Sequence, residues 1–412
     1  MLAKRSINKE VKDKVFVTAS EAKKAIEKYG KDSVINATIG SLHDENDNLV
    51  VLNSVMEGYR SLAPEDIMGY AQGITGSEEY KECVKRVVLG FDYKEKFKDN
   101  YMEVIATAGG SGAISNSLKN YLNIGEKVLL PNFMWEPYKM MAKEIGGEFE
   151  TYILFDEEGK FNLYDFKEKV YKLIEEQESL VIIINDPCQN PTGYKLTLEE
   201  WREILNILSE ASKIKNIILL NDIAYLDFDI RSSEEKEEYR KLFLDLPKNL
   251  LVIFLFSLSK SFTGYGLRVG VQLAISKNQE VIDQFREACS YSCRATWSNI
   301  SRGGMKIFSD IVLDEKRYKD LLIERQKYVD LLAERAKIFL EEAKEIDLKT
   351  FNYKSGFFIT IPVEKDMEKV IKKLKEQKIY VVEFVGALRI AICSIPKRKV
   401  YGLAEKIKQA ME

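Results

Sequence analysis

From about Asn100 to Ile275 the chain alternates short, continuous runs of Ile, Leu and Val with amphipathic segments. Continuous apolar runs are typical of strands that are covered on both faces, as in a parallel sheet. The segments between them have helical periodicity, as in Leu198 to Lys213, where one apolar stripe recurs. This alternation predicts an α/β fold with a large, mostly parallel, doubly wound sheet. The candidate strands are 102–106, 127–130, 180–185, 217–222, 250–257 and 269–275.

The pattern changes after about Leu313. A long charged helix pattern runs from Tyr318 toward Glu345 and is followed by a mixture of shorter strand and helix patterns. These are a strand at 356–361, a helix at 367–377, strands at 380–384 and 388–395, and a closing helix. We therefore expect a smaller α+β domain made of residues 1–45 together with 313–412, beside a large domain of residues 46–312.

Composition excludes several classes of function. Among 412 residues, 62 are Lys or Arg and 65 are Asp or Glu, a balance of −3 that gives no general attraction to nucleic acid or to an anionic membrane. No apolar run is long enough to span a bilayer, and the charged start, Met1 to Lys14, has no secretory pattern. The five scattered cysteines favour a reducing cytoplasm over a disulfide framework.

The chain has a single histidine, His43, in the polar stretch His43 to Asp47. A cluster of histidine metal ligands is therefore excluded, no metal site is expected, and a Ser-His-Asp hydrolase would depend on this one residue. His43 is better interpreted as a polar loop residue than as a general base.

The motif that carries most chemical information is Ser257-Leu258-Ser259-Lys260-Ser261, followed by three glycines and Arg268. A continuous apolar strand here delivers a lysine into a loop of small hydroxyl residues. A buried amine has a depressed pKa and can form a Schiff base, and hydroxyls with an arginine can bind a phosphate. The alternative is a strand end with a solvated lysine.

Three further motifs also follow apolar strands. Asn221-Asp222-Ile223-Ala224-Tyr225 places a carboxylate where ligands bind in α/β sheets, although an isolated Asp is more often a turn or helix-cap residue. Asn185 to Gly193 contains two prolines and a glycine, which fix an irregular loop around Asn190. Thr107 to Ala113 is rich in small residues and enters a helix, as at a phosphate-binding helix N-terminus. It lacks both the G-x-G-x-x-G pattern and the lysine of a P-loop.

These four motifs together resemble the fold-type I pyridoxal phosphate-dependent aminotransferases of class I/II, and the resemblance covers most of the chain. It implies that Lys260 forms the Schiff base with pyridoxal 5′-phosphate, that Asp222 pairs with the ring nitrogen, and that Asn190 and Tyr225 bind the phenolic oxygen. Lys260, Asp222 and Tyr225 are thereby the expected catalytic residues. The expected phosphate-binding residues are Gly110, Ser111, Ser257 and Arg268. In Pro131-Asn132-Phe133, Phe133 is the implied ring-stacking residue, with Trp135 as the alternative.

Further segments fit the same family. Gly40, Asn190 and Arg389 resemble substrate-binding positions, Arg389 being the clamp on the α-carboxylate, which a planar bidentate donor suits. Tyr70 resembles the tyrosine that reaches the phosphate of a partner subunit, which implies a homodimer with shared sites. Arg294 resembles an arginine that crosses the dimer to a distal carboxylate. A surface loop arginine is the alternative, because Ile300 replaces a proline often found after this motif.

The resemblance implies a ping-pong aminotransferase that moves an amino group between an amino acid, aspartate, glutamate or an aromatic one, and a 2-oxo acid such as 2-oxoglutarate. A β-lyase or an aminocyclopropane-carboxylate synthase-like enzyme would share the lysine motif. A non-catalytic regulator with an aminotransferase-like domain ranks last, because residues 1–40 are too few for a winged helix plus linker.

Overall fold

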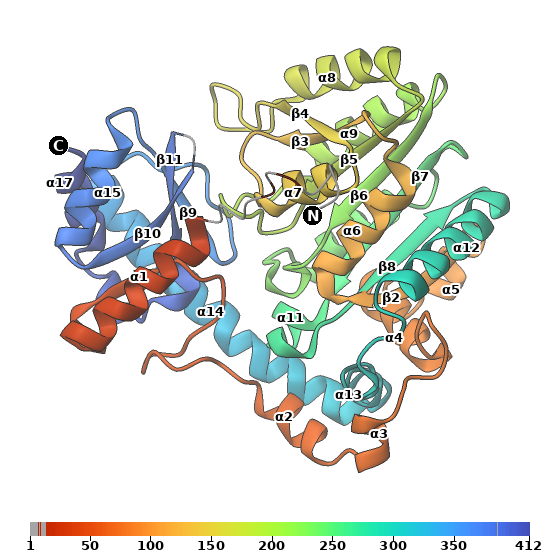
Figure 1. Ribbon diagram of the computed structural model, residues 1–412, viewed down its shortest axis with the longest axis horizontal. Coiled ribbons are helices and arrows are strands. Elements are labelled where there is room, and N and C mark those ends of the chain that lie inside the picture. The colour runs from red at the N-terminus through yellow and green to blue at the C-terminus, as the bar shows by residue number, and fades with distance from the viewer. Residues whose placement is uncertain (1–6, 8, 10–13, 385) are drawn as a thin grey trace. The chain divides into compact units, whose positions relative to one another are not determined.

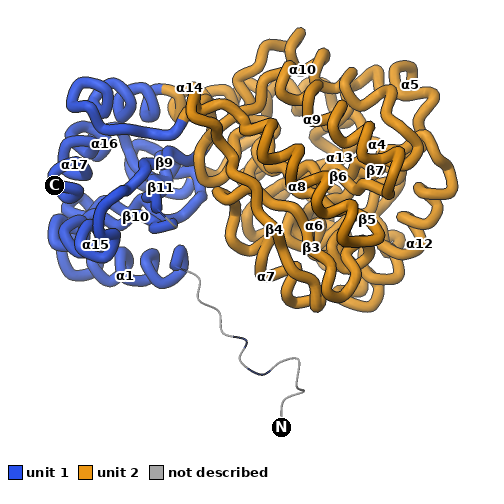
Figure 2. Tube along the Cα trace, turned by 90° about the horizontal axis from the view of Figure 1, so that it is seen from above, with its two compact units in different colours: residues 1–49, 334–351, 357–412 blue, residues 50–333, 352–356 orange. Residues whose placement is uncertain are grey.

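The computed structural model describes residues 7, 9, 14–384 and 386–412. The described chain forms two compact units, coloured separately in Figure 2. Unit 1 comprises residues 1–49, 334–351 and 357–412, and unit 2 comprises residues 50–333 and 352–356. The sequence pattern placed the corresponding divisions at 45/46 and 312/313. The second division of the compact units falls inside α14 (Glu315–Glu345), one unbroken helix whose charged pattern does not show where its packing changes.

Unit 2 contains a seven-stranded sheet with the order β2-β8-β7-β6-β5-β3-β4. Its strands are β2 (Tyr101–Ala108), β3 (Lys127–Pro131), β4 (Glu148–Tyr152), β5 (Ser179–Asn185), β6 (Asn216–Asp222), β7 (Leu250–Ser257) and β8 (Val269–Ser276). β8 is antiparallel to both of its neighbours, and the other neighbouring pairs are parallel. The expected α/β fold with a mostly parallel sheet is confirmed.

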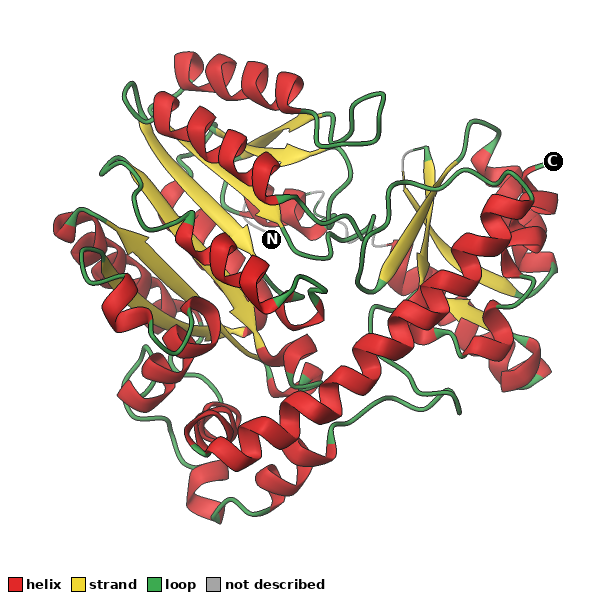
Figure 3. Cartoon of the chain, turned by 180° about the vertical axis from the view of Figure 1, so that it is seen from behind, coloured by secondary structure: helices red, strands yellow, loops and turns green. Residues whose placement is uncertain are grey.

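The apolar runs form strands here because helices cover both faces of the sheet (Figure 3). Side chains alternate between the two faces of a strand. Ile253 and Leu255 of β7 pack in a core cluster with α6, α7 and α12, whereas Phe254 packs against Phe243, which also contacts Trp201 of α9. All eight residues of β7 are buried, which explains its lack of polar alternation.

The helices of unit 2 are short except for α12 and the beginning of α14. Their bounds are α2 (Asn53–Arg60), α3 (Pro64–Met68), α4 (Glu78–Leu89), α5 (Tyr93–Lys96), α6 (Gly109–Tyr121), α7 (Pro137–Glu144), α8 (Leu163–Glu176), α9 (Leu198–Ala211), α10 (Ser233–Lys241), α11 (Leu258–Ser261), α12 (Gln279–Thr296) and α13 (Arg302–Leu313). Within the described part of the chain, no helix combines the length and apolar composition needed to cross a membrane.

The sequence pattern missed β4, which is the last strand at one edge of the sheet. Its residues, Glu148 to Tyr152, are mostly polar and only its last residue is fully buried. An edge strand covered on fewer sides does not need a continuous apolar run, so its periodicity is weak.

Unit 1 contains a four-stranded sheet with the order β1-β10-β11-β9. The strands are β1 (Ile35–Ala37), β9 (Phe358–Pro362), β10 (Ile379–Phe384) and β11 (Ala387–Ala391). Its helices, labelled in Figure 1, are α1 (Lys14–Tyr29), α15 (Met367–Glu376), α16 (Lys397–Val400) and α17 (Leu403–Met411). β1 lies beside β10, so the N-terminal and C-terminal parts of the chain share one sheet.

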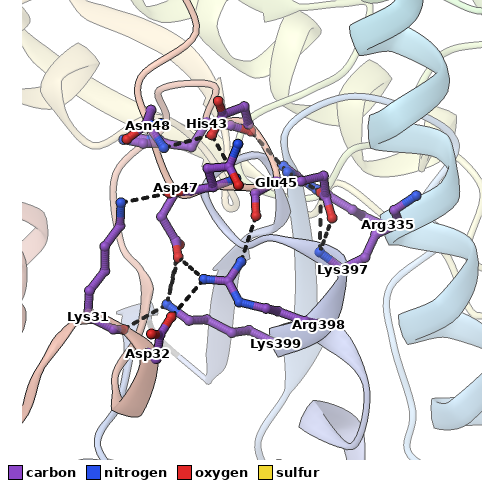
Figure 4. Close-up of polar contacts among 12 residues, drawn as sticks. Lys31, Asp32, His43, Glu45, Asp47, Asn48, Arg335, Lys397, Arg398 and Lys399 are labelled. Atoms are coloured by element: carbon purple, nitrogen blue, oxygen red, sulfur yellow. Dashed lines mark hydrogen bonds and ion pairs between the residues drawn. The ribbon is translucent and has the colours of Figure 1, made fainter.

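A polar network in unit 1 joins the loop around His43 to α14 and α16 (Figure 4). The fully buried guanidinium of Arg335 donates to the Glu45 carboxylate at 2.7 Å and to the carbonyls of His43 and Cys393, each at 3.0 Å. Arg398, which is more exposed, pairs with Asp47. His43 is one part of this network, with its Nδ1 3.0 Å from the Ser41 carbonyl oxygen.

Candidate active site

Lys260 lies just beyond the carboxyl end of β7, in the short helix α11. Lys260 is half-buried, and its ammonium lies 4.9 Å from the ring centroid of Tyr265 and 5.7 Å from that of Tyr225. Tyr225 follows β6, the parallel neighbour of β7. The parallel register therefore brings the lysine loop and the Asp222–Tyr225 segment to the same edge of the sheet, as the sequence predicts.

Asp222 ends β6 with only 7% of its surface exposed. One carboxylate oxygen accepts a hydrogen bond from the Tyr138 hydroxyl at 2.5 Å, and the other accepts from the Ala224 amide at 3.0 Å. Burial raises the pKa of the Asp222 carboxyl above its usual value, and these two hydrogen bonds act in the opposite direction. No cation is bonded to Asp222 among the described residues, so a cationic group placed beside it would relieve the cost of its charge.

Tyr138 is a site residue that the sequence analysis missed. It lies in the first turn of α7, and burial raises the pKa of its phenol well above the usual value, so the hydroxyl stays protonated and donates to Asp222. A fully buried tyrosine hydroxyl requires a polar partner, but the sequence does not show which one, because Asp222 lies 84 positions away.

Small residues and hydrogen-bond donors lie close together where β2 ends and α6 begins. The backbone of Gly109 is left-handed (φ 70°), and a Cβ there would lie 2.6 Å from Nη2 of Arg268. A Cβ on Gly110 would lie 3.7 Å from Oγ of Ser257. Ser111 is in the first turn of α6, where amide N–H groups have no partner within the helix. The four predicted phosphate-binding residues thus lie at one helix N-terminus, and Gly109 adds the close approach to Arg268.

The loop after β5 holds Asn190, which is buried. The Asn190 amide donates to the Asn185 side chain at 2.8 Å, and the Asn185 side chain donates to the Asp222 carbonyl at 2.8 Å. The segment 352–356 fixes the far end of the loop, since the amides of Lys354 and Ser355 both donate to the Gly193 carbonyl. Asn190 is thereby tied to the segment that carries Asp222.

Both candidates for the ring-stacking residue are partly buried after β3. The Trp135 ring packs edge-on against Tyr138, with centroids 5.5 Å apart, and so lies next to the partner of Asp222. Phe133 is linked to the Asn190 loop through its backbone, because Gln189 donates to the Phe133 carbonyl at 2.7 Å. The Trp135 side chain therefore contacts Tyr138, the residue that donates to Asp222.

Tyr70 and Arg294 lie on adjacent exposed segments of unit 2. Tyr70 is 86% exposed, and Arg294 is exposed near the end of α12, where it donates to the Ser298 hydroxyl. The Asn299 side chain, which follows Arg294 closely, donates to the Ala71 carbonyl at 3.2 Å. The segments that carry the two residues assigned by the sequence analysis to a partner's site thus contact each other.

Gly40 and Arg389 belong to unit 1, where one aromatic ring links them. Arg389 of β11 is 3% exposed, donates to the Thr38 carbonyl at 2.7 Å, and lies 4.3 Å from the Phe358 ring centroid. A Cβ on Gly40 would lie 2.6 Å from the Phe358 ring. Arg389 is therefore a buried arginine rather than a solvated surface arginine of the strand.

Comparison with known proteins gives the class of the chain. Residues 32–407 match the family described as aminotransferase class I and II. Aspartate aminotransferase of Salmonella typhi is 29% identical over 284 residues, which are 68% of this chain and 69% of that protein. Aromatic-amino-acid aminotransferase of Paracoccus denitrificans is 26% identical over 303 residues, 73% of this chain and 72% of that one. An aminotransferase crystal structure from Anaerococcus prevotii is 32% identical, covers 98% of both chains and has a TM-score of 0.92.

The chain belongs to the class I and II aminotransferase family. It is an enzyme, a transaminase of amino acids that depends on pyridoxal phosphate. The family, enzyme class and cofactor inferred from the four sequence motifs are confirmed.

The buried charge of Asp222 predicts an unusual stability effect. In the cofactor-free protein, Asp222→Asn should raise the free energy of unfolding by about 1–3 kcal/mol at pH 7, because it removes a buried charge but keeps the side-chain shape. The folded-state pKa is raised, so the folded protein binds this proton more tightly, and wild-type stability falls as pH rises from the unfolded through the folded pKa. The gain from Asp222→Asn should therefore vanish toward pH 4.

Urea unfolding at pH 4.5 to 8 measures this effect. The control is Asp229→Asn, because Asp229 is equally buried but bonded to Arg231 at 2.9 Å. This variant should be less stable than the wild type across the same pH range. Equal stability of the Asp222→Asn and wild-type proteins at pH 7 would show that the Asp222 charge is not costly.

Proposed function

We propose that this transaminase moves the amino group of a dicarboxylic or aromatic amino acid to a 2-oxo acid such as 2-oxoglutarate. The observation that carries the proposal is the meeting of Lys260, Asp222 and the helix α6 N-terminus at one edge of the unit 2 sheet. The names of the related aspartate and aromatic aminotransferases support the substrate classes.

The residues at this edge fit pyridoxal phosphate. The amides at the start of α6, with Ser111, Ser257 and Arg268, would hold the phosphate, since a helix N-terminus and a guanidinium both favour an anion. The close approach of Gly109 to Arg268, which any Cβ would block, supports a cradle for a compact group. When bound, the cofactor supplies an electron sink for the negative charge that develops at the substrate α-carbon.

The side chains around that cradle have distinct tasks. Lys260 would hold the cofactor covalently through Nζ and, as a free amine, would take the proton from the substrate α-carbon. The carboxylate of Asp222, oriented by Tyr138, would keep the ring nitrogen protonated. Asn190 and Tyr225 would donate to the phenolic oxygen. We assign the ring-stacking role to Trp135 rather than Phe133, because its ring contacts Tyr138.

The substrate carboxylates require arginines. Arg389 would bind the α-carboxylate through the guanidinium edge that Thr38 and Phe358 orient, with the Gly40 backbone close to the same ring. Arg294 would bind the distal carboxylate of aspartate, glutamate or 2-oxoglutarate from the partner subunit.

The exposed residues of unit 2 support the proposal of a homodimer with shared active sites. Tyr70 and Arg294, the residues proposed to act in trans, lie there on adjacent segments. Large apolar side chains are exposed on the same two stretches of sequence, Met68 at 84% and Tyr291 at 77%. Surfaces of this kind mark protein–protein interfaces.

We propose the cytoplasm as the site of action. All five cysteines are free and buried, as expected of a protein in a reducing compartment. Relatives named as cytoplasmic aspartate aminotransferases support the same location.

Replacing the lysine tests the reaction. Lys260→Ala should lower transamination by at least about 100-fold, because it removes the group that transfers the α-proton. Keto-acid formation from a panel of amino donors with 2-oxoglutarate measures the loss, with Lys277→Ala as a control remote from the site. Near wild-type turnover by Lys260→Ala would refute the assignment, and ammonia release without amination of 2-oxoglutarate would favour a lyase.

Replacing Arg294 tests the substrate. An ion pair shielded from water costs about 2–5 kcal/mol when one partner is removed, so Arg294→Ala should lower kcat/KM for aspartate by roughly 30-fold or more. An aromatic donor should be much less affected. The matched control is Arg286→Ala on the same helix, an exposed arginine paired with Asp283. Equal loss for both donors would remove Arg294 from the substrate site.

Hybrid dimers test the shared site. If Tyr70 acts in the partner's site, a dimer of one Lys260→Ala and one Tyr70→Ala subunit contains one intact site. Random co-assembly of these two inactive variants should restore about one quarter of the wild-type activity, because about half of the dimers are hybrids. No recovery after co-expression would place Tyr70 in its own subunit's site, and wild-type activity of Tyr70→Ala by itself would place Tyr70 outside the site.

A further inference from the structure

One arginine of unit 2 lies between the two loops that carry Asn190 and Tyr225. Arg231 donates through Nη1 to Asp229 at 2.9 Å and through Nη2 to Asp186 at 3.1 Å. The three side chains are at most 2% exposed. Charges buried this completely are stable only when each is bonded on several sides, so the cluster fixes its members tightly.

On one side the cluster closes the Asn190 loop. Asp186 begins this loop and also accepts from the Leu196 amide at 2.7 Å and from the Trp201 indole at 2.9 Å. Arg231 in turn donates to the Leu196 carbonyl at 2.6 Å. The first residue of the loop and its far end are therefore bonded to the same guanidinium.

On the other side the cluster holds the Tyr225 segment. The Arg231 amide donates to the Asp229 carboxylate at 3.0 Å, and the Phe228 amide donates to the Tyr225 carbonyl at 2.9 Å. The Arg231 guanidinium also lies 5.0 Å from the Tyr239 ring centroid. The Tyr239 hydroxyl accepts from Asn221, which precedes Asp222, at 2.6 Å. The Asn190 loop and the segment from Asn221 to Tyr225 are thus both linked to the Arg231 side chain, the second partly through Tyr239.

The hydrogen bonds between β5 and β6 do not fix the spacing of these two loops. β5 ends at Asn185 and β6 ends at Asp222, so Asn190 and Tyr225 both lie beyond the paired residues. Their spacing depends on contacts between the loops. The forked guanidinium of Arg231 reaches both carboxylates at once, which a lysine ammonium on a single stem does less well.

We propose that Arg231 is a positioning residue for the transamination site. It sets the spacing of the Asn190 and Tyr225 side chains and so controls how strongly they donate to the phenolic oxygen of the cofactor. Arg231 bonds to the loops that bear these donors, and its effect passes through them. This inference rests on the proposed roles of Asn190 and Tyr225.

The test is Arg231→Lys in the holoenzyme, read by the pH midpoint of the visible absorption band of the bound cofactor. If Asn190 and Tyr225 donate more weakly to the phenolic oxygen, the neighbouring imine nitrogen holds its proton more firmly. The pH midpoint of Arg231→Lys should therefore be higher than that of the wild type, as should the midpoint of Tyr225→Phe. Cofactor affinity should change by less than about threefold, since the phosphate contacts are intact. In a Tyr225→Phe background, Arg231→Lys should add a smaller shift, because the two act through one group.

The matched control is Arg335→Lys in unit 1, where an equally buried guanidinium bonds a carboxylate and two carbonyls outside the proposed site. It should lower the melting temperature without moving the midpoint. An unchanged midpoint in Arg231→Lys, or the same shift in both variants, would overturn the positioning role. If Arg231→Lys does not fold, Asp229→Asn, which keeps one acceptor oxygen, must show the upward shift. A wild-type protein with no visible band would instead refute the proposed function, and this inference with it.

Discussion

The common direction of β2, β5, β6 and β7 is the constraint on which the site depends. Hydrogen-bonded registers such as Asn185 with Asp222 fix where each strand ends relative to its neighbour. Because the strands run the same way, the residues that follow them lie along one edge of the sheet. β8 is antiparallel and begins at that edge, paired through Gly270 with Ser257. Donors from distant parts of the sequence therefore meet without a long structured loop.

At this edge of the sheet the Asp222 carboxylate is buried, so its negative charge costs free energy. Burial opposes ionisation of Asp222, and among the described residues only a phenol and one amide are bonded to its oxygens. A protonated ring nitrogen is the kind of partner that such a carboxylate lacks. With the proposed role of Asp222, the arrangement would lower the stability of the cofactor-free protein and favour binding of the protonated ring, a trade-off common at functional sites. The cluster around Arg231 differs from this, because each of its charged groups is bonded to a group of opposite charge.

Much of this organisation could be predicted from the sequence. The strands of the large sheet that are buried on both faces were found because such strands need continuous apolar runs, and β4 was missed because an edge strand does not. Lys260 and Asp222 were predicted as site residues because Asp222 closes such a run and Lys260 lies just beyond another. Tyr138 was missed because its partner is 84 positions away and no local pattern joins the two.

The sequence by itself determined the fold class, the order of the strands along the chain and the chemical identity of the groups at their ends. These depend on periodicity and on short motifs, which are local. Only the tertiary structure decided the strand order in the sheet, the hydrogen bond of Tyr138 to Asp222, and the joining of two loops by Arg231. Such contacts depend on which distant segments become neighbours, and that is set by the packing of the whole unit rather than by any stretch of residues within it.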